Sequence, residues 1–462
     1  MKDEILSNVV QEYLLSLLVF DDKAIPLIAS NVKINLFESF IFRDIATEAI
    51  SFYNQFKKPV GIHLDDIILK DKDTKVKPLY EEVLNKLKEH IKSINRDYIL
   101  SLLGKFIRTQ TLKTNILKAA ELVEKEEIDE AELVLNNCKA KQTEIFDSGI
   151  KFWNYNELSN IFETTENHIH CGIKELDSIE ACPAPKELLT FVALSSHGKT
   201  WFMTHLAKFA MLQRKNVVHI SLEMSEERLA IRYVQSLFSV AKNNELCSSP
   251  FFKKDEYGGL DDLKFDNIKP DLTLHNPNIT KIVKERLSKL KKKTLIVKEF
   301  PTSALTIIQL KAYLENLISL CSFVPDLILV DDPDNMKLDS NNLRIEIGNM
   351  YKQLRGIAIE YNCAMVAVSQ INRAGATARW INEKYLSEDF SKLFTSDILI
   401  SYNQTQYEYE HGLARLLVIK NRNQRKGDKI LISQNYNIGQ FCIDSVKLGR
   451  NYWNIIGEGN EE

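Results

Sequence analysis

The stretch Leu188-Leu-Thr-Phe-Val-Ala-Leu-Ser-Ser-His-Gly-Lys-Thr200, near the middle of the 462-residue chain, decides the fold. Its apolar half predicts a short buried strand over Leu188–Ala193, and after a tight loop a helical pattern follows from Trp201 to Arg214. A loop that runs from a strand into a helix N-terminus presents free backbone N–H groups and the positive end of the helix dipole to an anion. We therefore expect this loop to bind phosphate.

Lys199 and Thr200 hold the two positions that carry the chemistry of such a loop. The lysine reaches the terminal phosphates of a nucleotide, and the threonine hydroxyl coordinates Mg²⁺. The usual pattern G-x-x-x-x-G-K-S/T begins with glycine, whereas this chain has Ala193, which is acceptable if its φ is negative. Since a short GKT sequence also occurs by chance, a fortuitous loop is the alternative. The other expected nucleotide contacts are Ser195, Ser196, His197, Gly198 and Trp201.

Composition restricts the class of protein. The length predicts two to four domains, and 44% hydrophobic with 27% charged residues is typical of a globular protein. The formal net charge of −3 gives no overall basic field, so any nucleic-acid contact must be local. The seven cysteines form no C-x-x-C pair, which argues against a zinc site or a disulfide framework and fits a reducing cytosol. No signal peptide or membrane span is apparent, so we expect a cytoplasmic protein.

The chain divides into four expected segments. Residues 1–104 carry helical periodicity throughout, and residues 105–146 continue it as a helical hairpin with helices Ile107–Val123 and Asp129–Cys138. Residues 147–168 are a linker with one isolated helix, Tyr155–Phe162, whose apolar face needs a partner.

The hydrophobic pattern changes in residues 169–462, where short apolar runs alternate with helical stretches. This alternation predicts an α/β domain with a mostly parallel sheet and helices on both faces. The polar segment 243–278 is expected to be a surface excursion. The predicted strands are Leu188–Ala193, Val217–Ser221, Thr294–Val297, Leu327–Val330, Ala364–Val368, Ile398–Ser401 and Leu416–Ile419, with Lys429–Ser433 pairing to the last of these as a hairpin.

Acids follow two of these strands, at the edge where ligands of α/β sheets bind. Glu223 is placed to take a proton from an attacking water, and the alternative is an acid in the first turn of the next helix. Asp331 is the first acid after its strand and is the candidate for Mg²⁺. Because Asp332 and Asp334 follow it, the alternative there is a loop of helix-capping acids.

Three further polar residues lie near strand ends. Gln370 can hydrogen-bond a γ-phosphate and a following loop, so it is a candidate sensor of nucleotide state. Lys420 and Arg422 alternate and therefore point to one side of their strand. Inserted into a neighbour's site they would act as arginine fingers, whereas the alternative is a charged edge strand that resists aggregation.

These residues resemble the hexameric replicative DNA helicases of the DnaB type, including their tailed-phage relatives. The phrase Ile296-Val-Lys-Glu-Phe-Pro-Thr302 favours the phage branch. The N-terminal segment Gln11–Asp21 also resembles the family's first helix. The resemblance rests on Cys171–Asp177, Ala193–Thr200, Ile220–Ser225, Leu327–Asp331, Val368–Arg373 and Val418–Asn423, in this order and spacing.

The resemblance implies a RecA-like motor that uses ATP and Mg²⁺ and assembles as a ring or spiral of six around single-stranded DNA, in the host cytoplasm if the source is a phage. Each ATP site would then lie between subunits, with Lys420 and Arg422 acting in trans. The linker helix would dock on the adjacent motor, and the N-terminal helices would form a collar for primase or a loader. By the same likeness, the pore-loop cations would be Arg344, Arg373, Arg379 and Lys384.

One departure from the family is the segment Asp331-Asp-Pro-Asp-Asn-Met336, where an aromatic or apolar residue generally follows the acid. Pro333 fixes φ and lacks an N–H, so the first pore loop is expected to leave the strand differently. Two other functions remain open. A RecA-like recombinase would share the phosphate loop without the helical N-terminal domain, and a non-hydrolysing scaffold would keep only the ring.

Overall fold

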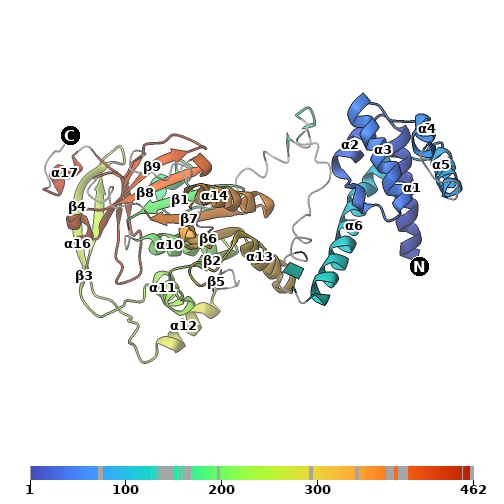
Figure 1. Ribbon diagram of the computed structural model, residues 1–462. Helices are drawn as coiled ribbons and strands as arrows, with labels where there is room; N and C mark the ends of the chain where they lie inside the picture. The colour runs from blue at the N-terminus through green and yellow to red at the C-terminus, as the bar shows by residue number, and fades with distance from the viewer. Residues whose placement is uncertain are drawn as a thin grey trace. The chain divides into compact units, whose positions relative to one another are not determined.

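The computed structural model describes the chain in two compact units, Met1–Leu158 and Ser159–Glu462, which are treated separately below (Figure 1). The residues it describes are 2–70, 76–125, 127, 130–131, 134, 150, 152–155, 158–159, 162, 168–194, 198–290, 295–338, 343–370, 379–382, 394–449 and 451–457. Within these ranges every helix is too short or too polar to cross a membrane.

Every secondary-structure element that the structure describes in the first unit is a helix, as the periodicity predicts. The core of this unit is formed by apolar positions spaced three and four apart, such as Leu14 and Leu18, which pack against Ile45 and Leu84. Ser39 and Asn95 cap two of the helices by accepting hydrogen bonds from backbone N–H groups of the first turn. The elements are α1 (Lys2–Phe20), α2 (Ile25–Asn31), η1 (Ile34–Leu36), α3 (Phe40–Phe56), α4 (His63–Leu69), α5 (Lys77–His90) and α6 (Arg96–Glu124).

Helix α6 corrects one predicted boundary. It runs without a break through Gly104, so the division between residues 1–104 and 105–146 falls inside a helix. A helical glycine costs only about 1 kcal/mol, and the burial of Leu103 and Phe106 on either side outweighs it. The predicted helices Asp129–Cys138 and Tyr155–Phe162 lie largely outside the described residues, and they stay predictions.

The second unit is built on a nine-stranded sheet in the order β11-β10-β9-β8-β1-β7-β6-β2-β5. The strands from β9 to β5 in this order are labelled in Figure 1. The six strands from β8 to β5 are parallel, while β9, β10 and β11 are antiparallel. Every predicted strand is found, so the predicted α/β class is confirmed. Their bounds are β1 (Leu188–Ala193), β2 (Val217–Ser221), β5 (Leu295–Glu299), β6 (Leu327–Asp331), β7 (Ala364–Gln370), β8 (Ile398–Asn403), β9 (Leu413–Asn421), β10 (Lys429–Ser433) and β11 (Ser445–Lys447).

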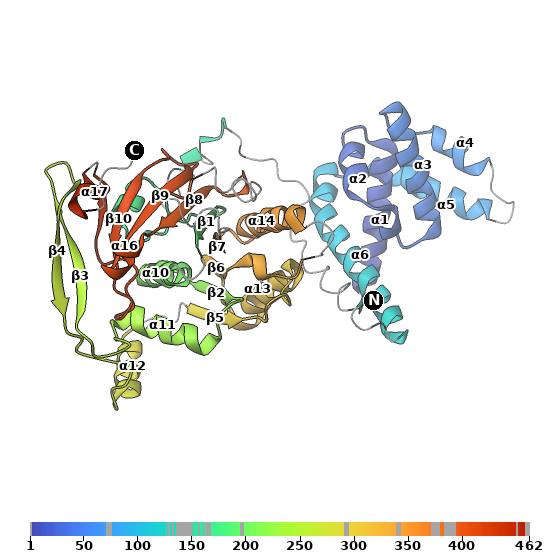
Figure 2. The ribbon, with the colours of Figure 1, turned by 60° about the vertical axis from the view of Figure 1, so that its left-hand side comes forward.

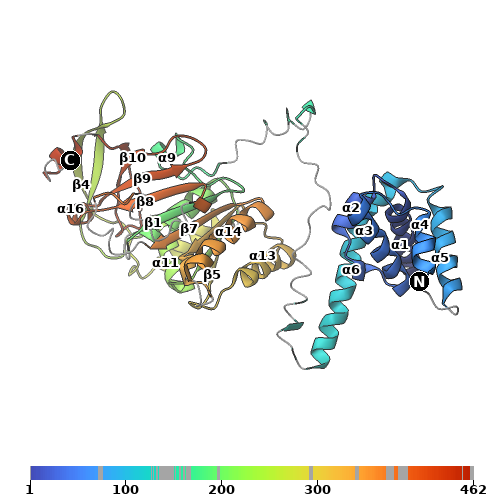
Figure 3. The same cartoon turned by 45° about the horizontal axis from the view of Figure 1, so that its top comes forward.

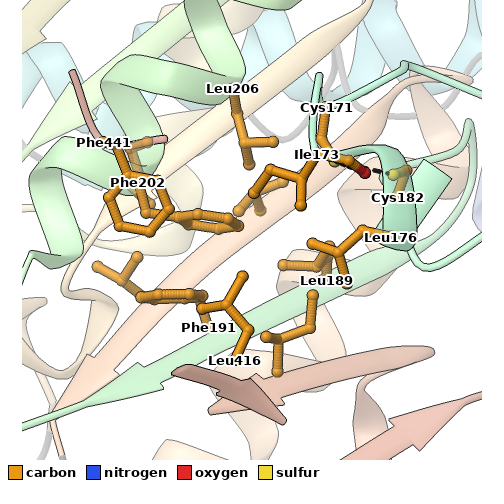
Figure 4. Packing of buried hydrophobic residues seen from close by; sticks show 14 of the residues in the cluster. Cys171, Ile173, Leu176, Cys182, Leu189, Phe191, Phe202, Leu206, Leu416 and Phe441 are labelled. Atoms are coloured by element: carbon orange, nitrogen blue, oxygen red, sulfur yellow. Dashed lines mark hydrogen bonds between the residues drawn. The ribbon is translucent and has the colours of Figure 1, made fainter. Parts of the chain in front are cut away.

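Helices cover both faces of this sheet because successive strand residues point to opposite sides. Phe191 of β1 stacks on Phe202 of α10 (Lys199–Leu212) with ring centroids 3.9 Å apart, in the core that α11 (Glu226–Phe238) also joins (Figure 4). Leu188 belongs to the core of the other face, which is covered by α13 (Ile307–Cys321) and α14 (Leu343–Glu360) (Figure 3). The remaining helices are α9 (Lys174–Asp177), α12 (Ile279–Ser288), η2 (Pro333–Asn335), α16 (Gln406–Glu410) and α17 (Tyr452–Ile455).

The polar segment 243–278 contains a two-stranded antiparallel ribbon that the sequence pattern did not predict (Figure 2). Its strands are β3 (Cys247–Lys254) and β4 (Leu260–Ile268). Phe252 and Leu260 are buried against Leu413 and Leu431 of the main sheet, whereas most other ribbon residues are exposed. With so few buried positions, the ribbon has almost no period-two hydrophobic signal.

Candidate functional site

The candidate site lies at the carboxyl edge of four neighbouring parallel strands, β1, β7, β6 and β2. The strand register aligns Ala193 with Gln370 and aligns Ser221 with Asp331. The phosphate loop follows β1, and Glu223 comes two residues after Ser221. Five of the predicted site residues therefore meet at one edge of the sheet, although they are up to 171 positions apart in the chain: Lys199, Thr200, Glu223, Asp331 and Gln370.

The two ends of the phosphate loop have the backbone that the motif needs. Ala193 is the buried last residue of β1 and is absent from the described residues with positive φ, so alanine is tolerated there. Gly198 precedes α10 with φ of 71°, and a Cβ atom on it would lie 2.6 Å from the Tyr436 hydroxyl. Glycine at 198 is thus required by both conformation and space. Ser195, Ser196 and His197 lie outside the described residues, and their contacts stay predictions.

Lys199 and Thr200 begin α10 and face the acids that follow β6. Lys199 Nζ lies 3.2 Å from Asp332 Oδ2, and both side chains are buried. The Thr200 hydroxyl donates a hydrogen bond to Asp331 Oδ2 at 2.9 Å. The predicted pairing of the threonine with Asp331 is therefore present in the geometry, and Asp332 adds a second carboxylate at the lysine.

Asp332 does not act as a helix-capping acid, which was the alternative for this acidic loop. It precedes η2, yet its side chain makes no capping hydrogen bond, and its φ of 58° is unusual for a residue with a Cβ atom. The carboxylate is instead directed at Lys199 and Gln370.

The acids retain capacity for a cation. Asp331 Oδ1 and Asp332 Oδ1 are buried and have no hydrogen-bond partner among the residues described. Burial raises the pKa of Asp331 to about 6, although the Thr200 hydrogen bond opposes this shift. Carboxylate and hydroxyl oxygens are the ligands that Mg²⁺ prefers, so Thr200 and Asp331 fit the metal role expected of them.

Asp331→Asn should stabilise the metal-free chain at neutral pH. The folded-state pKa of about 6 lies above the ordinary value of 3.8, so the folded chain holds the proton more tightly than the unfolded chain. The buried charge therefore costs stability that sets in as the pH rises from about 4 to about 6, up to about 3 kcal/mol. Thermal unfolding in EDTA should show a larger gain at about pH 8 than at about pH 5. A variant less stable than wild type at the higher pH would contradict this account.

Gln370 links two carboxylates across the site. Its Nε2 atom donates to Glu223 Oε1 and to Asp332 Oδ2, each at 2.8 Å. Burial raises the pKa of Glu223, and the charge of nearby Asp332 raises it further while Lys199 opposes the shift. Glu223 lies before Ser225, the N-cap of α11, so it is no first-turn acid of that helix. A raised pKa suits a group that must accept a proton.

Three residues near the loop belong to none of the sequence motifs: Arg232, Tyr436 and Asn335. Trp201 of α10 stacks on Tyr436 with ring centroids 5.4 Å apart, and the Arg232 guanidinium lies 5.0 Å from the centre of the Trp201 ring. Arg232 belongs to α11, and Tyr436 follows β10. Asn335 is a third addition, because its amide lies 3.4 Å from Glu223 Oε1. These residues come from loops and helix faces that only the tertiary fold brings to the site.

Lys420 and Arg422 lie at the opposite edge of the sheet. Arg422 Nη1 donates to Asp397 Oδ1 at 2.6 Å, and Asp397 directly precedes β8. The other oxygen of Asp397, Oδ2, accepts a hydrogen bond from the backbone N–H of Leu188, the first residue of β1. Lys420 Nζ donates to the carbonyl of Phe394 at 3.1 Å. The pairing of β9 with β10 ends at Leu417, so near Lys420 the strand is paired only with β8, and the charged-edge-strand alternative stays open.

The expected DNA-binding cations are only partly described. Arg344 lies in the first turn of α14, but its side chain is outside the description, as are Arg373 and Lys384 entirely. The Arg379 guanidinium lies 4.3 Å from the centre of the Trp453 ring, and its carbonyl accepts a hydrogen bond from Arg415. The DNA assignment of these four residues stays a prediction.

The fold and the site together define a RecA-like ATPase domain, with a phosphate loop after β1 and polar groups at the three neighbouring strand ends. The chain belongs to the family described as DnaB-like helicase C terminal domain, whose model matches residues 168–435.

Similar proteins come from bacteria and from a phage. The chain is 26% identical to the replicative DNA helicase DnaB of Buchnera aphidicola over 265 residues, which cover 55% of this chain and 51% of the relative. It is 23% identical to the DnaB-like replicative helicase of Enterobacteria phage T4 over 237 residues, 50% of this chain and 44% of the relative. The chain thus spans about half the length of these relatives.

Two solved structures share the fold. One is described as "The Structure Of A DnaB-Like Replicative Helicase And Its Interactions With Primase", with a TM-score of 0.62 and 14% identity, covering 93% of this chain and 98% of that chain. The other is described as an ATPase domain, with a TM-score of 0.51 and 14% identity, covering 64% of this chain and 99% of that chain.

Proposed function

We propose that this chain is the motor subunit of a replicative DNA helicase, which hydrolyses ATP to translocate on single-stranded DNA and separate the duplex at a fork. The observation that carries the proposal is the convergence of Lys199, Thr200, Glu223, Asp331 and Gln370 at four neighbouring strand ends. A scaffold that no longer hydrolyses nucleotide would have no need to keep this set of groups together.

Each group has a defined task in the proposed reaction. Lys199 leaves Asp332 and binds the terminal phosphates of ATP, while Thr200 and Asp331 hold Mg²⁺. Bound Mg²⁺ neutralises charge on the phosphate oxygens. Glu223 accepts the proton of the attacking water, and Gln370 connects this base to the phosphate side of the site. A nucleophilic residue is not required, because phosphoryl transfer to water depends on positioning and electrostatics.

Asp332→Asn should tighten nucleotide binding. The Asp332 carboxylate contacts both Lys199 and Gln370, the two groups proposed to meet the γ-phosphate, so it competes with that anion. Removing the charge leaves the lysine available, and we expect the Kd for a fluorescent ATP analogue to fall about three- to tenfold, equivalent to about 1 kcal/mol. Asp334→Asn is the matched control, because Asp334 accepts from Ser369 instead. Weaker binding by Asp332→Asn would instead assign this acid to the nucleotide–metal complex.

We propose that Lys420 and Arg422 complete the ATP site of the neighbouring subunit. Leu188 begins β1 and shares its contact with Asp397 with Arg422, whereas the phosphate loop of the same chain follows the far end of this six-residue strand. At about 3.3 Å per residue, the five steps from Leu188 to Ala193 span roughly 17 Å, which is beyond the reach of an arginine side chain. The pair does not reach the phosphate loop of its own chain, so an ATP site that it completes would belong to another copy, as in a ring or spiral of six subunits with ATP between them.

The proposed partners follow from the same family assignment. Single-stranded DNA would occupy the central pore, contacted by Arg344, Arg373, Arg379 and Lys384. The helical unit Met1–Leu158 would form the collar that receives primase and a helicase loader. The solved relative described with primase supports the primase part of this proposal.

One set of assays tests the function. ATP hydrolysis is measured with and without single-stranded DNA, alongside unwinding of a forked duplex, with Lys199→Ala as the inactive control. We expect turnover that DNA stimulates, and ATP-dependent unwinding. Turnover without unwinding would favour a recombinase-like ATPase, and the absence of turnover would favour a scaffold; either result overturns the helicase proposal.

A further inference from the structure

A second cluster of side chains with possible metal-ligand atoms lies in the segment that leads into β1, apart from the phosphate loop. Cys171 and Cys182 are buried at the border of the core on the α10 face, beside Ile173 and Leu176 (Figure 4). Their sulfur atoms are 3.2 Å apart, and the Cys182 thiol donates to Asp177 Oδ1 at 2.9 Å. The three ligand atoms of this cluster all lie within 4.8 Å of one another.

Asp177 is held firmly in place by the backbone. It lies at the end of α9, and its Oδ1 atom accepts the N–H of Cys171 at 2.8 Å while Oδ2 accepts the N–H of Gly172 at 3.1 Å. The segment is anchored in turn, because a Cβ on Gly172 would overlap the Phe209 ring of α10. The carboxylate oxygen beside the two thiols therefore needs little reorganisation to act as a ligand.

We propose that Cys171, Asp177 and Cys182 bind one thiophilic divalent cation of the Zn²⁺ type. Zinc accepts cysteine sulfur at about 2.3 Å and carboxylate oxygen at about 2.0–2.2 Å in a tetrahedral arrangement. Two sulfur atoms on such an ion are about 3.7 Å apart, so the observed separation needs to widen by only about half an ångström. Both thiols release their protons to solvent when the metal binds.

The fourth position can be filled by His170 or by water. His170 Nδ1 is 3.9 Å from Asp177 Oδ1, and 71% of its side chain is exposed, so the imidazole has room to turn toward the ion. Two thiolates, one carboxylate and a neutral imidazole form a mixed sulfur, oxygen and nitrogen set that suits zinc better than Mg²⁺ or Ca²⁺.

A disulfide between the same cysteines is the competing outcome for this cluster. A disulfide would use the two sulfur atoms alone, whereas a cation would be stabilised by both thiolates and the Asp177 carboxylate together. The lack of a C-x-x-C pair hides the cluster in the sequence, since eleven positions separate the two cysteines.

The test uses the full chain without a histidine tag, purified under reducing conditions and freed of metal by a chelator. Zn²⁺ is titrated against a chromophoric chelator, and Co²⁺ is added separately to report thiolate ligands through its charge-transfer absorption. We expect one equivalent of Zn²⁺ per chain, a Tm higher by several degrees, and a tetrahedral Co²⁺ spectrum. Cys182→Ser should weaken zinc binding at least tenfold, whereas Cys321→Ser, at an exposed cysteine, should leave it unchanged.

Two results would overturn the proposal. One is the absence of stoichiometric Zn²⁺ binding by the reduced wild-type chain. The other is a disulfide between Cys171 and Cys182, found by mass spectrometry without reductant, in a chain that binds no metal once reduced. If Cys182→Ser fails to fold, the Co²⁺ spectrum of the wild-type chain still decides, because it shows thiolate ligation directly. Metal content is independent of ATP turnover, so this outcome does not depend on the helicase assays.

Discussion

Glu223→Gln should lower ATP turnover by about 10²- to 10⁴-fold while nucleotide affinity stays within a few-fold of the wild-type value. Glutamine keeps the size of the side chain and can still meet the Gln370 amide through its oxygen, but it cannot accept the proton of the attacking water. Because the pKa of Glu223 is raised by burial, turnover of the wild-type chain should fall as the pH drops through that raised value.

Glu226→Gln is the matched control for this substitution. Glu226 lies three residues later, in the first turn of α11, and pairs with Lys298 at 2.8 Å instead of facing the phosphate loop. Turnover in the presence of single-stranded DNA and equilibrium binding of an ATP analogue are measured for both variants. Normal hydrolysis by Glu223→Gln would show that another group, with Asp332 the nearest candidate, acts as the base.

Arg422→Ala should lower turnover by about 10³- to 10⁵-fold, the range that arginine fingers supply in phosphoryl transfer. Its side chain is 48% exposed, and only Nη1 is engaged by Asp397, so other N–H groups of the guanidinium are available to a phosphate. Arg425→Ala is the control from the same loop, because Arg425 pairs only three residues away, with Asp428. Thermal unfolding of both variants separates a loss of chemistry from a loss of the Asp397 ion pair.

Mixing subunits decides whether Arg422 acts across an interface. In an equal mixture of Arg422→Ala and Lys199→Ala chains, a site is complete where an Arg422→Ala chain supplies the phosphate loop and a Lys199→Ala chain supplies the arginine. Random assembly makes about a quarter of the sites complete. We expect hydrolysis to recover toward that fraction, whereas each variant alone stays inactive. No recovery in particles that contain both chains would contradict action in trans.

The sequence predicts the second unit well because its parallel strands are buried on both faces. Such strands are continuous apolar runs, and Leu188–Ala193 and Val217–Ser221 have the bounds that the pattern predicts. The β3–β4 ribbon escaped prediction because it buries few residues. The boundary at Gly104 was misplaced for a different reason, since the burial of α6 outweighs the local preference of a glycine.

The candidate site was predictable to the extent that its groups follow strands directly. Gln370 and Asp331 end β7 and β6, so the register alone brings them to the phosphate loop. The sequence pattern offers Asp332 only as a helix-capping acid, because its contact with Lys199 depends on the positive φ of Asp332 itself. Arg232 and Tyr436 could not be found from local pattern, since they approach Trp201 from a helix face and a distant loop.

Asp397 gives the proposed ring a mechanical connection. This buried carboxylate binds Arg422 and Arg355 and also the backbone N–H of Leu188, where β1 begins. In the ring, a pull on Arg422 by the neighbour's phosphate would be applied to the start of a stiff strand whose other end carries the phosphate loop of the same subunit. The state of one ATP site would then be transmitted to the next through β1. Sequential ATP hydrolysis around the ring would require no separate coupling element.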